Sequence, residues 1–230
     1  MATTGTSRPA AEGLRERKKR AMRQQLSDTA ARMFVEHGFD AVRVTDVGEA
    51  CGVSEKTVFN YFPSKEALLL DRLEATAEAL RTHLSNPALP PVTAMLAVLD
   101  HELHGVVAGL SADTDTDTDR RLAQYQKFGD LIRNTPSLRA YRSDTADRFV
   151  DIAAEVLADR TGLRPDDPEP QIVAATLLGL WRVQFRALRI HLRPGHPVPA
   201  AIDAVTQEVR RAARLVEQGL ATFPERGKPR

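Results

Sequence analysis

Features that mark several common protein classes are missing from this sequence. It has one cysteine, Cys51, which excludes an intramolecular disulfide and the cysteine sets of structural zinc sites. It also lacks a glycine-rich phosphate loop, a nucleophile elbow and a clean metal-ligand spacing, so we predict no enzyme activity and no cofactor. A metal-dependent enzyme is the least favoured alternative. The longest apolar run, residues 172–185, contains Arg182 and Gln184 and is too short for a bilayer.

Short tails are expected at both ends of the chain. The first dozen residues are small and polar and lack the apolar core of a signal peptide, so we predict a disordered tail at 1–13. Residues 223–230 are assigned to a C-terminal tail. Together with the single cysteine, this composition predicts a protein of the reducing cytoplasm.

Charge is unevenly distributed along the chain, although the formal net charge is +1. Basic residues gather near the N-terminus, whereas acidic residues gather at 113–119 and 166–169. The chain of 230 residues suffices to bury a sizeable core and to form one small and one larger domain.

Residues 44–68 have the pattern of two short helices joined by a tight turn and followed by a third helix. The Thr45 hydroxyl is placed to cap a helix that runs to about Cys51. Gly52 can adopt the left-handed conformation that a sharp turn requires. Ser54 is the expected N-cap of the next helix. This order is the layout of a helix-turn-helix DNA-binding motif.

The second helix of this motif, residues 55–62, is expected to present a polar face. We predict that Val58, Phe59 and Phe62 pack inward at helical spacing. The polar side chains on the other side are Glu55, Lys56, Thr57, Asn60 and Tyr61. A helix of this length fits the major groove of DNA.

A longer helix is predicted upstream, over residues 13–38, with an apolar stripe that supports the motif. The stripe consists of Met22, Leu26, Ala30, Met33, Phe34 and His37. The first turns of this helix are basic instead, with Arg15, Arg17, Lys18, Lys19, Arg20 and Arg23 against Glu16. A basic run can be a solvated helix face, but one helix before a helix-turn-helix it indicates contacts to DNA phosphates.

Residues 22–68 resemble the DNA-binding domain of the tetracycline-repressor (TetR) family of bacterial transcription regulators. The matching residues are Ala30, Phe34, Gly38, Phe39, Val47, Gly52, Val53, Ser54, Thr57, Phe59, Tyr61, Phe62, Ser64, Lys65 and Leu68. Gly48 and Cys51 depart from the family pattern, in which alanine is common at both positions. Glycine at position 48 is expected to cost its helix about 1 kcal/mol relative to alanine, whereas Cys51 is a small apolar replacement.

The rest of the sequence predicts further helices and no strand, so the expected fold class is all-α. The helices cover residues 65–84, 92–110, 120–133, 136–160, 169–191 and 198–220. Pro63 ends the second helix of the motif, which is the expected recognition helix. Ser64 caps the helix that follows, and the prolines within 86–91 end that helix. The polar repeat at 111–119 is expected to be a mobile loop.

Two domains follow from these assignments. We assign residues 14–66 to a three-helix DNA-binding domain and residues 67–222 to a larger helical domain for effector binding and dimerisation. The resemblance implies a homodimer in which the last two helices of each subunit form a four-helix interface. A two-fold dimer places two recognition helices on successive faces of the major groove, which predicts a palindromic operator. By periodicity alone, the last helix is ordinary core packing.

The resemblance also implies a pocket for an effector, often apolar or aromatic, in the larger domain. The expected lining consists of Met95, Leu99, Leu103, His104, Tyr125, Phe128, Ile132, Phe149, Trp181 and Phe185. Each residue taken singly is typical of ordinary core, so the pocket is a hypothesis about the group. His101 and His104 are three residues apart on one helical face, which suits a metal pair or hydrogen bonds to a ligand. The alternative is a role at the surface.

Side-chain chemistry divides the expected DNA contacts into two kinds. Base-edge contacts are assigned to Arg43, Lys56, Thr57 and Asn60. Phosphate contacts are assigned to Thr45, Ser54, Tyr61 and Lys65, and to Lys18 and Lys19 of the basic run. The sequence therefore predicts a DNA-binding regulator, expected to be a repressor that a small effector releases from DNA. The alternative is a helical docking module whose helix-turn-helix does not bind DNA.

Overall fold

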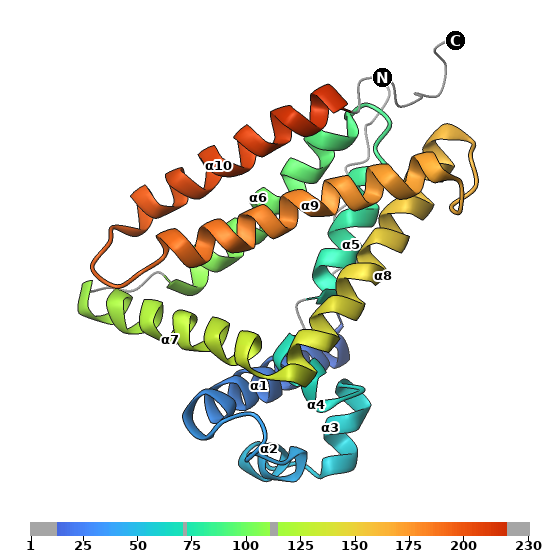
Figure 1. Ribbon diagram of the computed structural model, residues 1–230. Helices are drawn as coiled ribbons and strands as arrows, with labels where there is room; N and C mark the ends of the chain where they lie inside the picture. Colours follow the sequence, from blue (N-terminus) through green and yellow to red (C-terminus); the bar gives the residue numbers. More distant parts are fainter. Residues whose placement is uncertain (1–12, 71–72, 111–114, 220–230) are drawn as a thin grey trace, which may run out of the picture. The chain divides into compact units, whose positions relative to one another are not determined.

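The computed structural model describes residues 13–70, 73–110 and 115–219, and no strand occurs in these ranges. Every element is an α-helix, which confirms the predicted fold class (Figure 1). None of the described helices is long and apolar enough to cross a membrane. Apart from Gly13, the two predicted tails lie outside the described residues. The chain divides into two compact units, residues 1–71 and 72–230.

The helices of the first unit are α1 (Leu14–His37), α2 (Val44–Ala50), α3 (Glu55–Tyr61) and α4 (Lys65–Leu70). The predicted support helix is confirmed as α1, which begins after Gly13 and ends at His37, directly before Gly38, whose φ is 88°. The buried residues of α1 are Leu26, Ala30 and Phe34. Met22 and Met33 are half-buried and His37 is exposed, so the core uses the middle of the expected stripe.

The beginning of α2 differs from the prediction. Thr45 is not the N-cap, because it lies inside the helix and Arg43 precedes the first turn. The Asp46 carboxylate accepts a hydrogen bond from the backbone N–H of Arg43 at 2.8 Å. A carboxylate at the third helical position can reach back across the first turn and satisfy this donor. The predicted cap at Ser64 is confirmed, since its Oγ accepts from the N–H of Ala67 at 3.2 Å.

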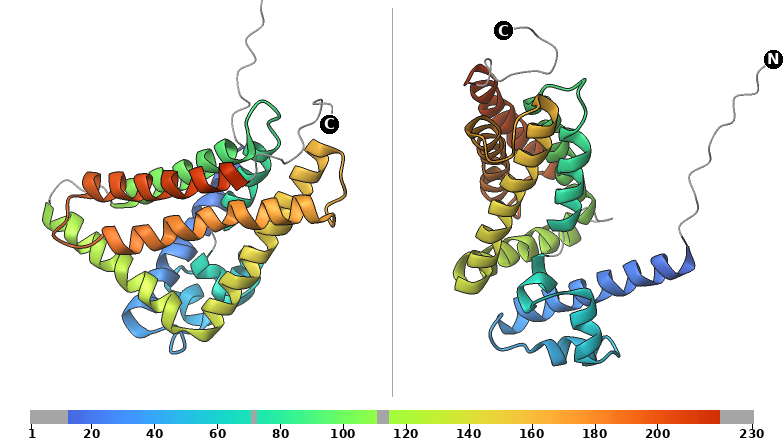
Figure 2. Two further views of the ribbon diagram at one scale, coloured as in Figure 1. Left: turned by 45° about the horizontal axis from the view of Figure 1, so that its top comes forward. Right: turned by 90° about the vertical axis from the view of Figure 1, so that its right-hand side faces the viewer.

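The helices of the second unit are α5 (Leu73–Leu84), α6 (Pro91–Leu110), α7 (Asp115–Asn134), α8 (Pro136–Thr161), α9 (Pro168–His191) and α10 (Val198–Gly219). Helix α9 packs against α6, α8 and α10, and α9 and α10 run side by side (Figure 2). One buried apolar cluster joins all six of these helices through Leu80, Leu99, Leu122, Leu157, Leu177 and Val205. Core formation in this unit therefore depends on side chains from every helix from α5 to α10.

The loop predicted at 111–119 is wrong for its second half, because α7 already begins at Asp115. Asp117 lies in the first turn, where a carboxylate is favoured by the helix dipole, and it pairs with Arg120 at 2.6 Å. Residues 111–114 lie outside the described residues. The helix expected over 65–84 is described as α4 and α5, and residues 71–72 between them also lie outside the described residues.

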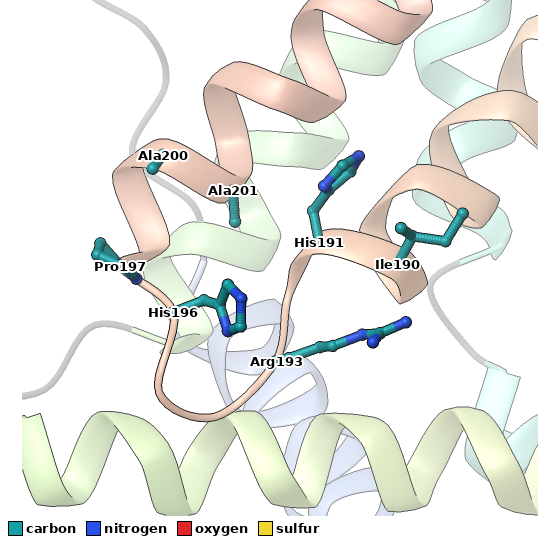
Figure 3. A pocket seen from close by; sticks show the side chains of 7 residues that line it. All are labelled: Ile190, His191, Arg193, His196, Pro197, Ala200 and Ala201. Atoms are coloured by element: carbon teal, nitrogen blue, oxygen red, sulfur yellow. The ribbon is translucent and has the colours of Figure 1, made fainter.

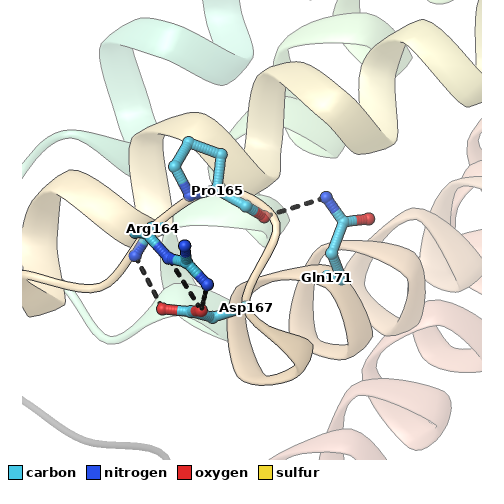
Figure 4. A network of polar contacts seen from close by, with 4 residues as sticks. All are labelled: Arg164, Pro165, Asp167 and Gln171. Atoms are coloured by element: carbon cyan, nitrogen blue, oxygen red, sulfur yellow. Dashed lines mark hydrogen bonds and ion pairs between the residues drawn. The ribbon is translucent and has the colours of Figure 1, made fainter.

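Polar contacts hold the connection between α8 and α9 (Figure 4). The Asp167 carboxylate accepts from the backbone N–H of Arg164 at 2.8 Å and from its guanidinium at 3.1 Å. Gln171 Nε2 donates to the Pro165 carbonyl oxygen at 3.0 Å. The backbone hydrogen bond, with support from the guanidinium, lowers the pKa of Asp167. The same Arg-x-x-Asp hydrogen bonds occur at the start of α2, but Asp46 lies inside α2 whereas Asp167 directly precedes α9.

Candidate nucleic-acid interface

The turn between α2 and α3 depends on two glycines. Gly52 has a φ of 71°, as predicted for the turn residue. Gly48 lies against the turn, since a Cβ at this position would be 2.8 Å from the Val53 carbonyl oxygen and 3.3 Å from Cγ2 of Val58. The N–H of Val53 also donates to the Gly48 carbonyl oxygen at 2.9 Å. Close packing therefore explains why glycine occupies position 48, whereas the sequence indicated only that glycine destabilises the helix relative to alanine.

Ser54 begins the recognition helix α3, as predicted. Its Oγ accepts from the N–H of Thr57 at 3.2 Å and lies 2.9 Å from Oγ1 of the same residue. Ser54 is exposed and Thr57 is half-buried. The hydroxyls of Ser54 and Thr57, two of those predicted to contact DNA, thus lie together at the N-terminal end of α3, where they fix the first turn.

The outer face of α3 presents Lys56, Phe59 and Asn60, which are exposed and spaced three and four residues apart. The prediction that Phe59 packs inward is wrong, because this side chain is 46% exposed. Val58 and Phe62 are each 1% exposed and fill the inner side of this short helix. Phe59 is turned about 100° from Val58 around the helix axis and therefore faces outward. The exposed face combines an ammonium, an amide and a phenyl ring.

Arg23, the last residue of the basic run, contacts the C-terminal end of α3. Its guanidinium donates to the Tyr61 carbonyl oxygen at 2.8 Å and lies 4.8 Å from the centroid of the Phe62 ring. A cation is favoured at this place because the last carbonyl groups of a helix carry partial negative charge. Lys18 and Lys19 are exposed, as are Arg15, Arg17 and Arg20. The sequence alone groups Arg23 with these residues, because charge does not show which arginine contacts α3.

Arg43, a predicted base contact, is held by a neighbouring carboxylate. Its Nη2 and Nε lie 3.0 Å and 3.3 Å from Oδ1 of Asp46, and its side chain is 79% exposed. Hydrogen bonds from the side chain and then the backbone of Arg43 lower the pKa of Asp46. The same side-chain hydrogen bond raises the pKa of Arg43. Any contact between Arg43 and DNA must therefore compete with Asp46.

Lys65, a predicted phosphate contact, packs on an aromatic pair. Its Nζ lies 4.3 Å from the ring centroid of Phe39 and 5.6 Å from that of Phe34. The two ring centroids are 4.9 Å apart. Lys65 and Tyr61 are half-buried, as is Thr45. The ammonium of Lys65 thus has a structural contact in addition to its predicted contact with DNA.

Comparison with known protein families accounts for both units. Residues 26–71 match the family described as "Bacterial regulatory proteins, tetR family", and residues 93–220 match the "MftR C-terminal domain". The second match spans more than half of the chain. This chain belongs to the TetR family. It is a DNA-binding transcription regulator of the helix-turn-helix type.

The chain is also similar to individual proteins, two of which are named as transcriptional regulators. The mycofactocin biosynthesis transcriptional regulator MftR of Mycobacterium tuberculosis is 27% identical over 164 residues, which cover 71% of this chain and 78% of that protein. The HTH-type transcriptional regulator TcmR of Streptomyces glaucescens is 29% identical over 187 residues, which cover 78% of each chain. The solved SmeT–triclosan complex is 19% identical, with a TM-score of 0.49 over 90% of this chain and 93% of that chain.

The residues predicted to line an effector pocket occupy different environments in the second unit. Those that belong to its buried cluster are Met95, Leu99, Leu103, Phe149 and Trp181. Tyr125 packs against this cluster, Phe128 is half-buried and Ile132 is buried. His104 is exposed beside Asp100, and Phe185 is 47% exposed. His101 is exposed as well, and no group that could hold a metal ion occurs among the described residues.

Polar groups that the sequence did not indicate lie beside this cluster. The Glu102 carboxylate accepts from Nε1 of Trp181 at 2.7 Å and from Oγ1 of Thr76 at 2.5 Å. Gln184 is buried and donates to the Leu99 carbonyl oxygen at 3.0 Å. These contacts connect α5, α6 and α9 within the apolar interior. Glu102 and Trp181 lie on helices three apart in the chain, so their contact produces no periodic pattern in the sequence.

A crevice of about 190 Å³ lies elsewhere, between the end of α9 and the start of α10 (Figure 3). Its lining consists of Ile190, His191, Arg193, His196, Pro197, Ala200 and Ala201. None of the predicted pocket residues borders it. His191 Nε2 lies 2.8 Å from the Glu208 carboxylate, which joins the two helices next to the crevice.

Proposed function

We propose that this TetR-family regulator reads a palindromic operator with the exposed face of α3. The observation that carries the proposal is the outward position of Lys56, Phe59 and Asn60 on a helix that is fixed at both ends. Ser54 fixes the start of α3 by capping, and Arg23 fixes its end through the Tyr61 carbonyl oxygen. Lys56 and Asn60 are proposed to contact base edges, because ammonium and amide groups pair with purine acceptors and donors in the major groove.

The proposed assembly is a homodimer in which α9 and α10 of each protomer meet. Exposed apolar side chains support this interface, since Ile172 and Phe185 of α9 are 63% and 47% exposed and Leu215 of α10 is 69% exposed. A two-fold axis between the protomers would present two α3 helices to one duplex. The operator is therefore proposed to be palindromic.

A small effector is proposed to bind among the helices of the second unit and to release the protein from DNA in the cytoplasm. Five of the predicted lining residues share one buried cluster, and Glu102 adds a hydrogen-bonding group beside it. The effector can shift DNA affinity only by as much as it prefers one conformation of the protein over the other. The expected outcome is repression that is relieved by the effector.

The proposal is tested by measuring the affinity for random duplex DNA at increasing salt concentration. Binding to phosphates releases counterions, so the affinity should fall steeply with salt, with a logarithmic slope of about −0.9 for each neutralised phosphate. Lys18→Ala and Lys19→Ala should each make the slope shallower. Lys127→Ala, which removes an exposed lysine of α7, is the control and should leave it unchanged. Absent or salt-insensitive binding would favour the docking module instead.

A further inference from the structure

Helix α8 carries a row of acidic side chains along its exposed face. The row consists of Asp144, Asp147, Asp151, Glu155 and Asp159, all of which are exposed. Their spacing of three and four residues places them on one side of the helix. Arg148 lies on the same side, which leaves the face negative by four charges, counted as five carboxylates less one guanidinium. We refer to these five residues as the acidic row.

Helix α9 carries a complementary row of arginines. Arg182, Arg186 and Arg189 are exposed and are spaced four and three residues apart, which also places them on one side of the helix. Phe185 lies beside this arginine row and contacts Trp181, with ring centroids 4.6 Å apart. The arginine row thus borders an exposed apolar side chain. A charged margin beside apolar side chains is the usual arrangement at protein interfaces.

The two rows do not pair with each other within the protomer. No ion pair involves any of these eight side chains in residues 13–70, 73–110 and 115–219. Figure 1 shows the reason, because the C-terminal half of α9 extends away from α8 and carries the arginine row with it. Each row of charge is therefore available to a second molecule.

We propose that the acidic row of one protomer pairs with the arginine row of the second copy in the homodimer. This inference rests on the homodimer proposed above and adds α8 to its interface. A two-fold axis makes such a contact twice, since the acidic row of each protomer meets the arginine row of its partner. Charge complementarity of this kind fixes the register and speeds the encounter of the two copies.

The pairing is tested by charge reversal and sedimentation equilibrium of the full chain without DNA. The α9 variant is Arg182→Glu with Arg186→Glu, and the α8 variant is Asp151→Arg with Glu155→Arg. In a homodimer of either variant, both contacts between α8 of one protomer and α9 of its partner join like charges. The dimer dissociation constant of each variant should therefore rise at least about tenfold. An equimolar mixture should form a heterodimer as tight as the wild-type dimer, because both contacts are then between opposite charges.

The controls separate this inference from the proposed homodimer. Arg142→Glu reverses an exposed arginine elsewhere on α8 and should not change dimerisation. Thermal unfolding monitored by circular dichroism establishes that each variant remains helical. If wild type is monomeric, the homodimer and the pairing both fail. If wild type is dimeric but the variants dimerise normally, or if mixing does not restore association, the pairing is wrong and the homodimer stands.

Discussion

The guanidinium of Arg23 donates a hydrogen bond to the Tyr61 carbonyl oxygen at 2.8 Å and thereby ties the support helix α1 to the end of the recognition helix α3. This contact gives one arginine of the basic run a positioning role. Neighbouring lysines of the run are exposed and are proposed to contact phosphates instead. The two roles lead to different measurable effects on DNA binding.

Replacement of Arg23 should weaken discrimination between DNA sequences more than it weakens general affinity. Arg23→Ala removes a charge-assisted hydrogen bond, so we expect a loss of about 1.5–3 kcal/mol in the free energy of unfolding. The salt slope on random DNA should stay near the wild-type value. Lys18→Ala should show the opposite pattern, with a shallower slope and unchanged stability. Urea unfolding and salt titrations check both, and a shallower slope for Arg23→Ala would show that this residue contacts phosphate.

Gly48→Ala should destabilise the first unit although alanine favours helices. The added Cβ would lie 2.8 Å from the Val53 carbonyl oxygen, and backbone must move to accept it. We expect a loss of about 1–3 kcal/mol in the free energy of unfolding, as for other overpacked sites. The control is Gly105→Ala in α6, where no atom lies within 4 Å of the added Cβ. That variant should gain about 0.5–1 kcal/mol. Equal gains in both variants would contradict the close approach at Gly48.

The contact between Arg43 and Asp46 should make the first unit sensitive to acid. The folded state lowers the pKa of Asp46, so the contact stabilises the protein above the ordinary aspartate pKa of about 3.9. This stability is lost as the pH falls through the lowered value, because the carboxyl group then takes up a proton. Asp46→Asn should reduce the dependence of the melting temperature on pH below about pH 4. Asp40→Asn, at an exposed carboxylate, is the comparison, and an identical effect of both substitutions would show that the contact adds nothing.

Lys56 and Lys65 should affect DNA binding in different ways. Lys56 lies on the exposed face of α3, so Lys56→Ala should relax sequence specificity by about 1–3 kcal/mol at one base pair. Lys65→Ala should weaken binding to all sequences alike, and should also lower stability because Lys65 packs on Phe39. Competition assays with single-base variants of the operator distinguish the two. Equal loss of specificity in both variants would contradict the assigned roles.

Helix boundaries and caps in the first unit were largely predictable from sequence because they depend on neighbouring residues. Gly52, Ser54 and Ser64 each act within a few positions, and the structure places all three as expected. The start of α2 was not predicted correctly. Either the Thr45 hydroxyl or the Asp46 carboxylate could cap a helix here, and in the structure Asp46 accepts the hydrogen bond from the backbone N–H of Arg43. The outward position of Phe59 was missed because a helix of seven residues gives too few turns to define its buried side.

Contacts between distant residues could not be predicted from periodicity. Arg23 reaches Tyr61 across 38 positions, and Glu102 meets Trp181 across 79 positions. Arg23 and Glu102 are polar residues on otherwise ordinary helices, so the packing of the helices determines which residues they contact. The effector pocket remains a prediction for the same reason, because lining a cavity and filling a core require the same side chains.

Selection of bound sequences from a random duplex library tests the central claim most directly. Wild type and Asn60→Ala are compared at near-physiological salt, with Asn134→Ala, an exposed position at the end of α7, as the matched control. We predict that wild type and the control enrich the same palindrome and that Asn60→Ala loses preference at defined positions in each half-site. Enrichment of no sequence by wild type, or an unchanged palindrome with Asn60→Ala, would contradict recognition through the exposed face of α3.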